Sequence, residues 1–256
     1  MTQNLFVGID VAFAKGKRLP VCLLRKTGDE LEIVPLRKFF RPPPLGKGNV
    51  AALDENVRER YAAEVGEWIC DLQSHVGGKI KRVAIDAPSY YAARDQSRRA
   101  AERAMDKMGI SVFATPTKNK FKEITMKARR HIAEGGAAAR LPHANQIWML
   151  IGFELFKVLR SEFECIEVYP QAIVRELGLG KHYKTTSEGH SEQVAALARR
   201  MNASVDGLHR QLFEIGYGSR HDKLDALMSA WVASLDEENR VALGNPPEDV
   251  IWVPRT

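Results

Sequence analysis

The sequence predicts an α/β fold in which helices flank one mixed sheet, and three observations support this prediction. Three strand-like apolar runs open the chain, a segment with helical periodicity follows them, and later apolar runs that stop at a proline alternate with helical segments. The chain has 256 residues, which is enough for one large domain with an insertion. We therefore expect one domain over residues 1–256, with a sheet whose three leading strands are followed by parallel strands.

The first part of the chain predicts four strands and one long helix. Runs rich in Val, Ile, Leu and Phe occupy residues 5–13, 19–26 and 31–40, and a proline-rich loop, RPPPLGKGN, follows them. Between about residues 50 and 75, apolar residues recur at helical spacing: Val57, Tyr61, Val65, Trp68 and Leu72. Gly77 and Gly78 predict the end of this helix, and a short buried strand over residues 80–89 stops at Pro88.

The rest of the chain predicts more helix than a simple crossover needs. Residues 94–160 are mainly helical in pattern, and we expect a helical insertion there. A strand over residues 164–170 ends at Pro170, an apolar helix covers about residues 219–235, and residues 250–254 form a last strand.

Composition and charge restrict the class of protein. The net charge of +6 and the pI of about 9.2 permit contact with nucleic acid without requiring it. Cys22, Cys70 and Cys165 are odd in number and far apart, so we expect reduced cysteines and a cytoplasmic protein. We expect no secretory signal and no membrane span. The oligomeric state stays open, and a homodimer is one alternative.

Acidic residues lie at the ends of the predicted strands. Asp10 ends LFVGI, Asp86 ends RVAI and Glu167 lies within CIEVYP. Because neighbouring parallel strands bring their carboxyl ends to one edge of a sheet, we expect these acids to converge with Asp225 of the last helix. Oxygen ligands without His or Cys favour Mg²⁺ or Mn²⁺, which would relieve the repulsion among the carboxylates. Singly, each strand acid has an alternative: a turn for Asp10 and Asp86, and an arginine partner for Glu167.

The last helix carries two aspartates with different explanations. Ser219 followed by Asp222 fits an N-terminal capping box, which suffices to explain Asp222. Asp225 lies one turn further in and is the only charged residue between Leu224 and Leu235. A carboxylate buried there needs a partner.

Short motifs follow one another along the chain: GID, AIDAP, RDQSRRAAE, ANQIWMLIGFEL, IEVYP, KTTSEGHSEQVAAL, HDKLDAL and VIWVP. In this order they resemble the predicted RNase H-like nucleases, and more narrowly the family filed as domain of unknown function 429. The resemblance spans nearly the whole chain. The HDKLDAL helix also resembles the terminal helix of RuvC-type resolvases, which carries two aspartates at the same spacing.

The resemblance implies an RNase H-like fold with a site for two Mg²⁺ or Mn²⁺ ions held by carboxylates. By position, Asp10 would bridge both ions, and Asp86 and Asp225 would complete the site. Glu167 and Asp222 would be additional or outer ligands. The sequence departs from the typical pattern after AIDAP, where Ser-Tyr-Tyr replaces a glycine-containing loop, and it has a histidine beside Asp222 in place of a second acid.

The implied activity is a metal-dependent nuclease that hydrolyses phosphodiester bonds in DNA or RNA. With two ions about 3.5–4 Å apart, one activates the attacking water and the other stabilises the leaving 3′ oxygen. Lys184 and His221 are candidates for protonating the leaving group or holding the phosphate.

A basic segment predicts contact with nucleic acid. Between residues 117 and 131 the sequence places one acid among six cations: Lys118, Lys120, Lys122, Lys127, Arg129 and Arg130. The alternative is a solvated helix face whose Phe121, Ile124 and Ala128 point to the core. Arg98 and Arg99 are further candidates for facing the substrate, since both lie within the RDQSRRAAE motif.

Two other functions stay open. A phosphotransferase of the sugar-kinase and actin type also begins near GID, but it needs phosphate-binding loops, which VAFAKGK and APSYY do not resemble. A non-catalytic nucleic-acid-binding protein on the same fold would lack a ligand, whereas every acid of the predicted site is present. The nuclease is therefore the favoured prediction.

Overall fold

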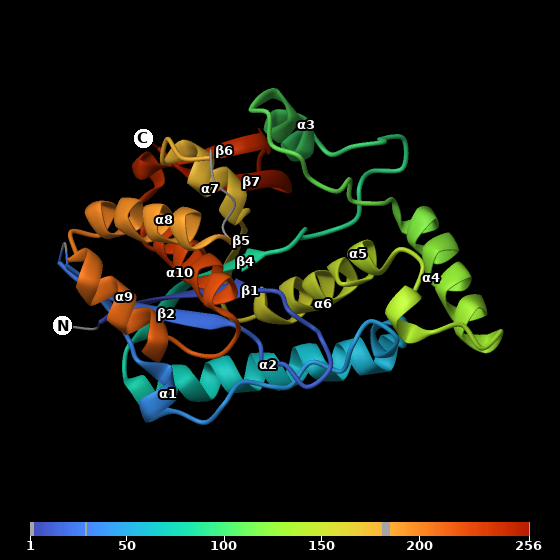
Figure 1. Cartoon of the computed structure of the whole chain (residues 1–256), viewed down its shortest axis with the longest axis horizontal. Coiled ribbons are helices and arrows are strands. Elements are labelled where there is room, and N and C mark those ends of the chain that lie inside the picture. The colour runs from blue at the N-terminus through green and yellow to red at the C-terminus, as the bar shows by residue number, and fades with distance from the viewer. Residues whose placement is uncertain (1–2, 29, 181–184, 256) are drawn as a thin grey trace.

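The computed structural model describes residues 3–28, 30–180 and 185–255, and a five-stranded sheet lies at its centre (Figure 1). The strands are β1 (Asn4–Asp10), β2 (Val21–Thr27), β3 (Glu30–Ile33), β4 (Lys79–Asp86) and β5 (Glu164–Glu167). Their order is β3-β2-β1-β4-β5. The first three strands pair antiparallel, and β4 and β5 continue the sheet parallel to β1. The predicted mixed sheet is therefore confirmed.

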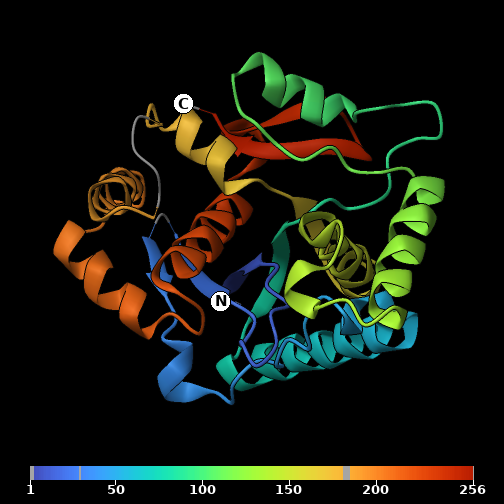
Figure 2. The same cartoon turned by 45° about the vertical axis from the view of Figure 1, so that its right-hand side comes forward.

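Helices cover both faces of this sheet (Figures 1 and 2). On one face, Leu5, Val7 and Ile9 of β1 join an apolar cluster with α2 (Glu55–Val76) and α6 (Met149–Leu159). Phe6 lies on the other face with α10 (Arg220–Ser234), as expected for side chains that alternate along a strand. The elements beside α10 are α7 (Pro170–Glu176), α8 (Ser187–Arg200) and α9 (Val205–Glu214).

The close contact between α10 and β1 depends on Gly8. A Cβ at this position would collide with the main chain of Ala226 and Ala230 of α10. The two elements run in opposite directions, because Ala226 lies beside Gly8 while Ser234 accepts a hydrogen bond from Lys26, the ladder partner of Asn4. The N-terminus of α10 therefore lies at the carboxyl ends of β1 and β4.

The C-terminal strand belongs to a second, two-stranded sheet. Residues 250–254 form a strand as predicted, within β7 (Asp249–Pro254), which pairs antiparallel with β6 (Arg240–Asn245). Strand β6 was not predicted from the sequence, although NPPE between two apolar runs is typical of a hairpin connection. A single bridge between Val168 and Trp252 joins this hairpin to the end of β5.

Two predicted boundaries were wrong. The third leading strand ends at Ile33, and α1 (Leu36–Phe39) follows because Pro35 cannot donate a ladder hydrogen bond. The region predicted to be helical from residue 94 becomes helical only at residue 100. Its elements are α3 (Ala100–Lys107), α4 (Lys118–Ala133), η2 (Ala138–Arg140), α5 (Ala144–Ile147) and α6. Because α6 shares the core of the sheet, the end of this region is part of the main fold.

The long predicted helix is confirmed, together with its end at Gly77, but it begins at Glu55 and not near residue 50. Asp54 caps α2 by accepting a hydrogen bond from the Asn56 amide, and Gly77 ends the helix with a φ of 71°. Two short 3-10 segments complete the elements: η1 (Ala51–Leu53) and η3 (Glu237–Asn239). The three cysteines are free, and Cys22 is buried.

Candidate functional site

The parallel register of β1 and β4 places Asp10 directly beside Asp86. Residues that are partners in a parallel ladder point to the same face of the sheet. Gly8 lies two residues before Asp10 and faces α10, so both carboxylates belong to the α10 face. Both are half-buried at the carboxyl edge of the sheet.

Asp225 belongs to the same edge. It precedes Ala226, the residue that packs on Gly8, and only 2% of its surface is exposed. The first turns of α10 thus bring a third carboxylate toward the ends of β1 and β4, on a helix whose positive end favours negative charge nearby. Three adjacent elements, β1, β4 and α10, therefore each supply one aspartate.

The donor set suits the predicted ions, since three carboxylates are hard oxygen ligands of the kind that Mg²⁺ and Mn²⁺ prefer. Among residues 3–28, 30–180 and 185–255, however, no group of three or more His, Cys, Asp or Glu side chains could hold a metal ion. The backbone brings the aspartates to one edge, but their side chains do not form a ready ligand set. The metal site stays a prediction that rests on donor chemistry and backbone position.

Glu167 lines a small cavity together with Asp86, but its carboxylate is engaged by another partner. Its ladder partner is Ile85, which lies in the apolar cluster of the opposite face, so Glu167 points away from the α10 face. There it forms a buried two-point ion pair with Arg99, with both N–O distances at 2.8 Å, and it accepts a hydrogen bond from the Ser89 amide at 2.8 Å. Both side chains of the pair are only 5% exposed. The arginine partner that the sequence allowed for Glu167 is therefore the one observed.

The charges of this pair depend on each other. Burial raises the pKa of Glu167, and the Arg99 guanidinium and the Ser89 amide oppose that shift. Burial also lowers the pKa of Arg99, but the carboxylates of Glu167, Asp249 and Glu102 together raise it above its ordinary value. Arg99 extends the network to Asp249, which in turn accepts hydrogen bonds from the Ala100 and Ala101 amides at the start of α3. This network joins the β6–β7 hairpin to β5.

Asp222 has the structural role that its spacing predicts. Its carboxylate accepts a hydrogen bond from the Ser219 amide at 2.8 Å, and Ser219 caps the Asp222 amide in return. His221 lies 3.1 Å from the other carboxylate oxygen. Lys184, the other candidate for holding the phosphate, lies outside the described residues.

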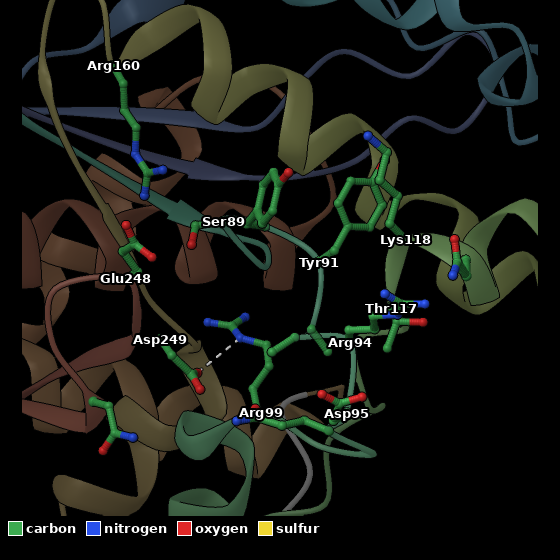
Figure 3. A pocket seen from close by; sticks show the side chains of 16 residues that line it. Ser89, Tyr91, Arg94, Asp95, Arg99, Thr117, Lys118, Arg160, Glu248 and Asp249 are labelled. Atoms are coloured by element: carbon green, nitrogen blue, oxygen red, sulfur yellow. Dashed lines mark hydrogen bonds and ion pairs between the residues drawn. The ribbon is translucent and has the colours of Figure 1, made fainter.

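A cavity of about 1200 Å³ opens beside the loop that follows β4. It extends between that loop, the start of α4, the end of α6 and the β6–β7 turn (Figure 3). Arg160 and Glu248 lie at one side of the cavity, Lys118 and Arg94 at the other, and the Arg99–Asp249 pair between them. Ser89 lines this cavity and lies three residues after Asp86 in the chain.

Several residues of this cavity were not predicted from the sequence. Tyr90 is 62% exposed and Tyr91 contacts its ring edge-on, in the Ser-Tyr-Tyr segment that departs from the family pattern. Arg160, which directly follows α6, also lines the cavity, but it belongs to none of the sequence motifs that indicate a function. The adjacent Tyr90 and Tyr91 were the available signal, because exposed aromatic rings near cations are typical of surfaces on which bases stack.

The basic segment is α4, and its cations differ in their surroundings. Phe121, Ile124 and Ala128 are buried, so the core-facing alternative for these three residues is confirmed. Its six predicted cations, Lys118, Lys120, Lys122, Lys127, Arg129 and Arg130, are exposed. Two of them form ion pairs at 2.7 Å: Lys120 with Glu123, and Arg130 with Glu134. Lys118 lines the large cavity.

Other cations in these two basic segments contact the protein itself. Arg129 donates a hydrogen bond to the Leu53 carbonyl at 2.6 Å. Arg98 forms an ion pair with Asp106 at 2.8 Å and also donates to the Val112 carbonyl. Of the predicted nucleic-acid contacts, Lys118 and Arg99 line the cavity, and Arg99 is engaged there by Glu167 and Asp249.

The fold and the site define an α/β protein with a mixed five-stranded sheet and aspartates gathered at the carboxyl edge of its parallel strands. The family described as "Protein of unknown function (DUF429)" matches residues 8–249, and the chain belongs to this family. No curated protein and no solved structure matches the chain significantly. Within the described part of the chain, no helix is both long and apolar enough to cross a bilayer.

Proposed function

We propose that the chain is a metal-dependent nuclease of RNase H-like fold that hydrolyses phosphodiester bonds in nucleic acid. The observation that carries this proposal is the ladder pairing of Asp10 with Asp86, with Asp225 presented to the same edge by α10. The order of the sheet, three antiparallel strands followed by two parallel ones, supports the fold.

The proposal gives the aspartates and the cavity separate roles. Asp10, Asp86 and Asp225 would hold Mg²⁺ or Mn²⁺, which supply an activated water and stabilise negative charge on the phosphate oxygens. Glu167 is left out of this ligand set because Arg99 engages both of its oxygens. The cations that line the large cavity would orient the nucleic-acid backbone, and the exposed ring of Tyr90 would support a base by stacking.

One observation favours a non-catalytic nucleic-acid-binding protein as the second candidate. The described side chains do not form a three-ligand metal group, which is what a fold that had lost catalysis would show. The two candidates make different predictions about cleavage but the same prediction about the cavity, so both experiments below are needed.

We expect Asp10→Asn to lower cleavage of nucleic acid at least about 100-fold in Mg²⁺ or Mn²⁺, because it removes a charged ligand from the centre of the site. The measurement compares single-stranded, duplex, hybrid and branched substrates, with EDTA added to a parallel set. Asp71→Asn is the matched control, since Asp71 is an exposed acid on α2. Equal cleavage by Asp10→Asn and the parent chain, or no cleavage of any substrate, would remove the nuclease from consideration.

We expect Lys118→Gln combined with Arg160→Gln to weaken binding of a labelled oligonucleotide roughly tenfold at low salt. The slope of log affinity against log salt concentration should also fall, by about 1 for each phosphate that the variant no longer neutralises. Arg130→Gln serves as the control, because this exposed cation is paired with Glu134 outside the cavity. If Arg130→Gln weakens binding as much as the double variant does, the cavity has no special role and the whole basic surface acts together.

A further inference from the structure

A second cavity, of about 420 Å³, lies between α8, α9 and α10, and we call it the His190 cavity. Its lining residues are His190, His209, Leu212, Phe213, Arg220 and Lys223. Two of these helices, α8 and α9, lie on the opposite side of the molecule from α4, whose first residue lines the large cavity (Figures 1 and 2). The His190 cavity is therefore a separate feature from the candidate substrate cavity.

His190 is a buried polar residue whose ring is incompletely hydrogen-bonded within the fold. Only 2% of its surface is exposed, and neither ring nitrogen has a hydrogen-bond partner of good geometry among the described residues, although the Arg220 backbone approaches the ring. A buried polar group that lacks a partner destabilises a protein, so such a group in a cavity wall suggests a ligand. Its ring stacks on His209, with the ring centroids 5.9 Å apart. Burial, followed by the positive charge of Arg220, lowers the pKa of His190 to about 4, so the ring is neutral near pH 7 and offers one donor and one acceptor.

The remaining polar groups of this cavity are basic. Arg220 and Lys223 lie one turn apart at the start of α10, and no acidic side chain lines the cavity in the described part of the chain. This concentration of donors and positive charge favours an anion, and phosphate is the anion that such side chains commonly bind.

The cavity also has an apolar part. Phe213 is 77% exposed, and the Lys223 ammonium lies 5.6 Å from the centre of its ring. An exposed aromatic ring beside a phosphate-binding cation is suited to stacking on a base. The volume exceeds what a single phosphate needs and lies within the range of pockets for small organic ligands.

We propose that the His190 cavity binds a nucleoside phosphate. Arg220 and Lys223 contact the phosphate, His190 hydrogen-bonds to the ligand, and Phe213 stacks on the base. The ligand is either a free nucleotide or the terminal nucleotide of a strand. This proposal does not depend on the nuclease function, because none of Asp10, Asp86 and Asp225 lines the cavity.

The test is calorimetric titration of the full chain with adenosine 5′-monophosphate, inorganic phosphate and adenosine. We expect the nucleotide to bind more tightly than either part alone, and Arg220→Met and Lys223→Met each to weaken it at least about tenfold. Arg200→Met is the matched control, because Arg200 is an exposed cation on α8 outside the cavity. Asp10→Asn should bind the nucleotide as the parent chain does, whatever the outcome of the cleavage assay.

A second measurement reads binding on the parent chain, and a variant is used only to assign its signals. Histidine ring resonances of the parent chain are followed during the nucleotide titration, and His190→Gln assigns the His190 signals, which we expect to shift. Competition by a 5′-phosphorylated tetranucleotide would identify strand ends as ligands, and its absence would identify free nucleotides. The proposal is overturned if the nucleotide does not bind, if adenosine binds equally well, if the two α10 variants bind as the parent does, or if the His190 signals do not move.

Discussion

Gly8→Ala is expected to destabilise the protein by at least about 3 kcal/mol, measured as the free energy of unfolding in urea. The added Cβ would overlap main-chain atoms of Ala226 and Ala230, which cannot move aside as the end of a flexible side chain can. The only relief is a shift of α10 away from β1. Since α10 buries every residue from Leu224 to Ser234, such a shift would expose apolar surface along the whole helix.

The same shift would change the candidate site, because Asp225 is carried by α10 and Asp10 by β1. Gly135→Ala is the matched control: it adds the same methyl group at a residue with nothing within 4 Å, where only the φ of 82° is unfavourable. We expect it to cost about 1–2 kcal/mol. A Gly8→Ala protein as stable as the control would show that α10 and β1 are not held in close contact.

Arg99→Met is the second change with a large expected effect, a loss of about 3–5 kcal/mol of unfolding free energy. It would leave the Glu167 carboxylate buried without its cation, and Asp249 would lose the same partner. The double variant Arg99→Met with Glu167→Met removes both charges, and we expect it to be more stable than Arg99→Met alone.

The neighbouring arginine provides the control for this prediction. Arg98 pairs with Asp106, and both side chains are at least 30% exposed, so Arg98→Met should cost under about 1 kcal/mol. Urea unfolding of the four proteins completes the comparison. Equal losses for Arg98→Met and Arg99→Met would contradict the distinction between a buried and an exposed ion pair.

The sequence predicted much of the fold because its signals are local. Alternating and continuous apolar runs marked the five strands of the main sheet, and helical periodicity with Gly77 marked α2. Strand β6 was missed, although its hairpin pattern was present in the sequence. The third leading strand was predicted to extend too far, because its apolar pattern continues past Pro35 into α1.

The candidate site was predicted in part. The acids at the ends of β1 and β4 came from the sequence, as did the capping role of Asp222. The sequence could not place Glu167, because the face on which a strand residue lies depends on its register with the neighbouring strand. Pairing with Ile85 turns Glu167 to the opposite face, where Arg99 meets it.

By itself, the sequence determined which residues form strands and helices, and that Asp10 and Asp86 end two of those strands. These properties follow from the spacing of apolar residues along the chain. Only the tertiary structure decided that Asp10 pairs with Asp86 and that Glu167 belongs to a buried ion pair. It also decided that α10 packs directly on Gly8, which brings Asp225 to the same edge of the sheet. The physical reason is that register and close contact depend on partners distant in sequence, which no local pattern specifies.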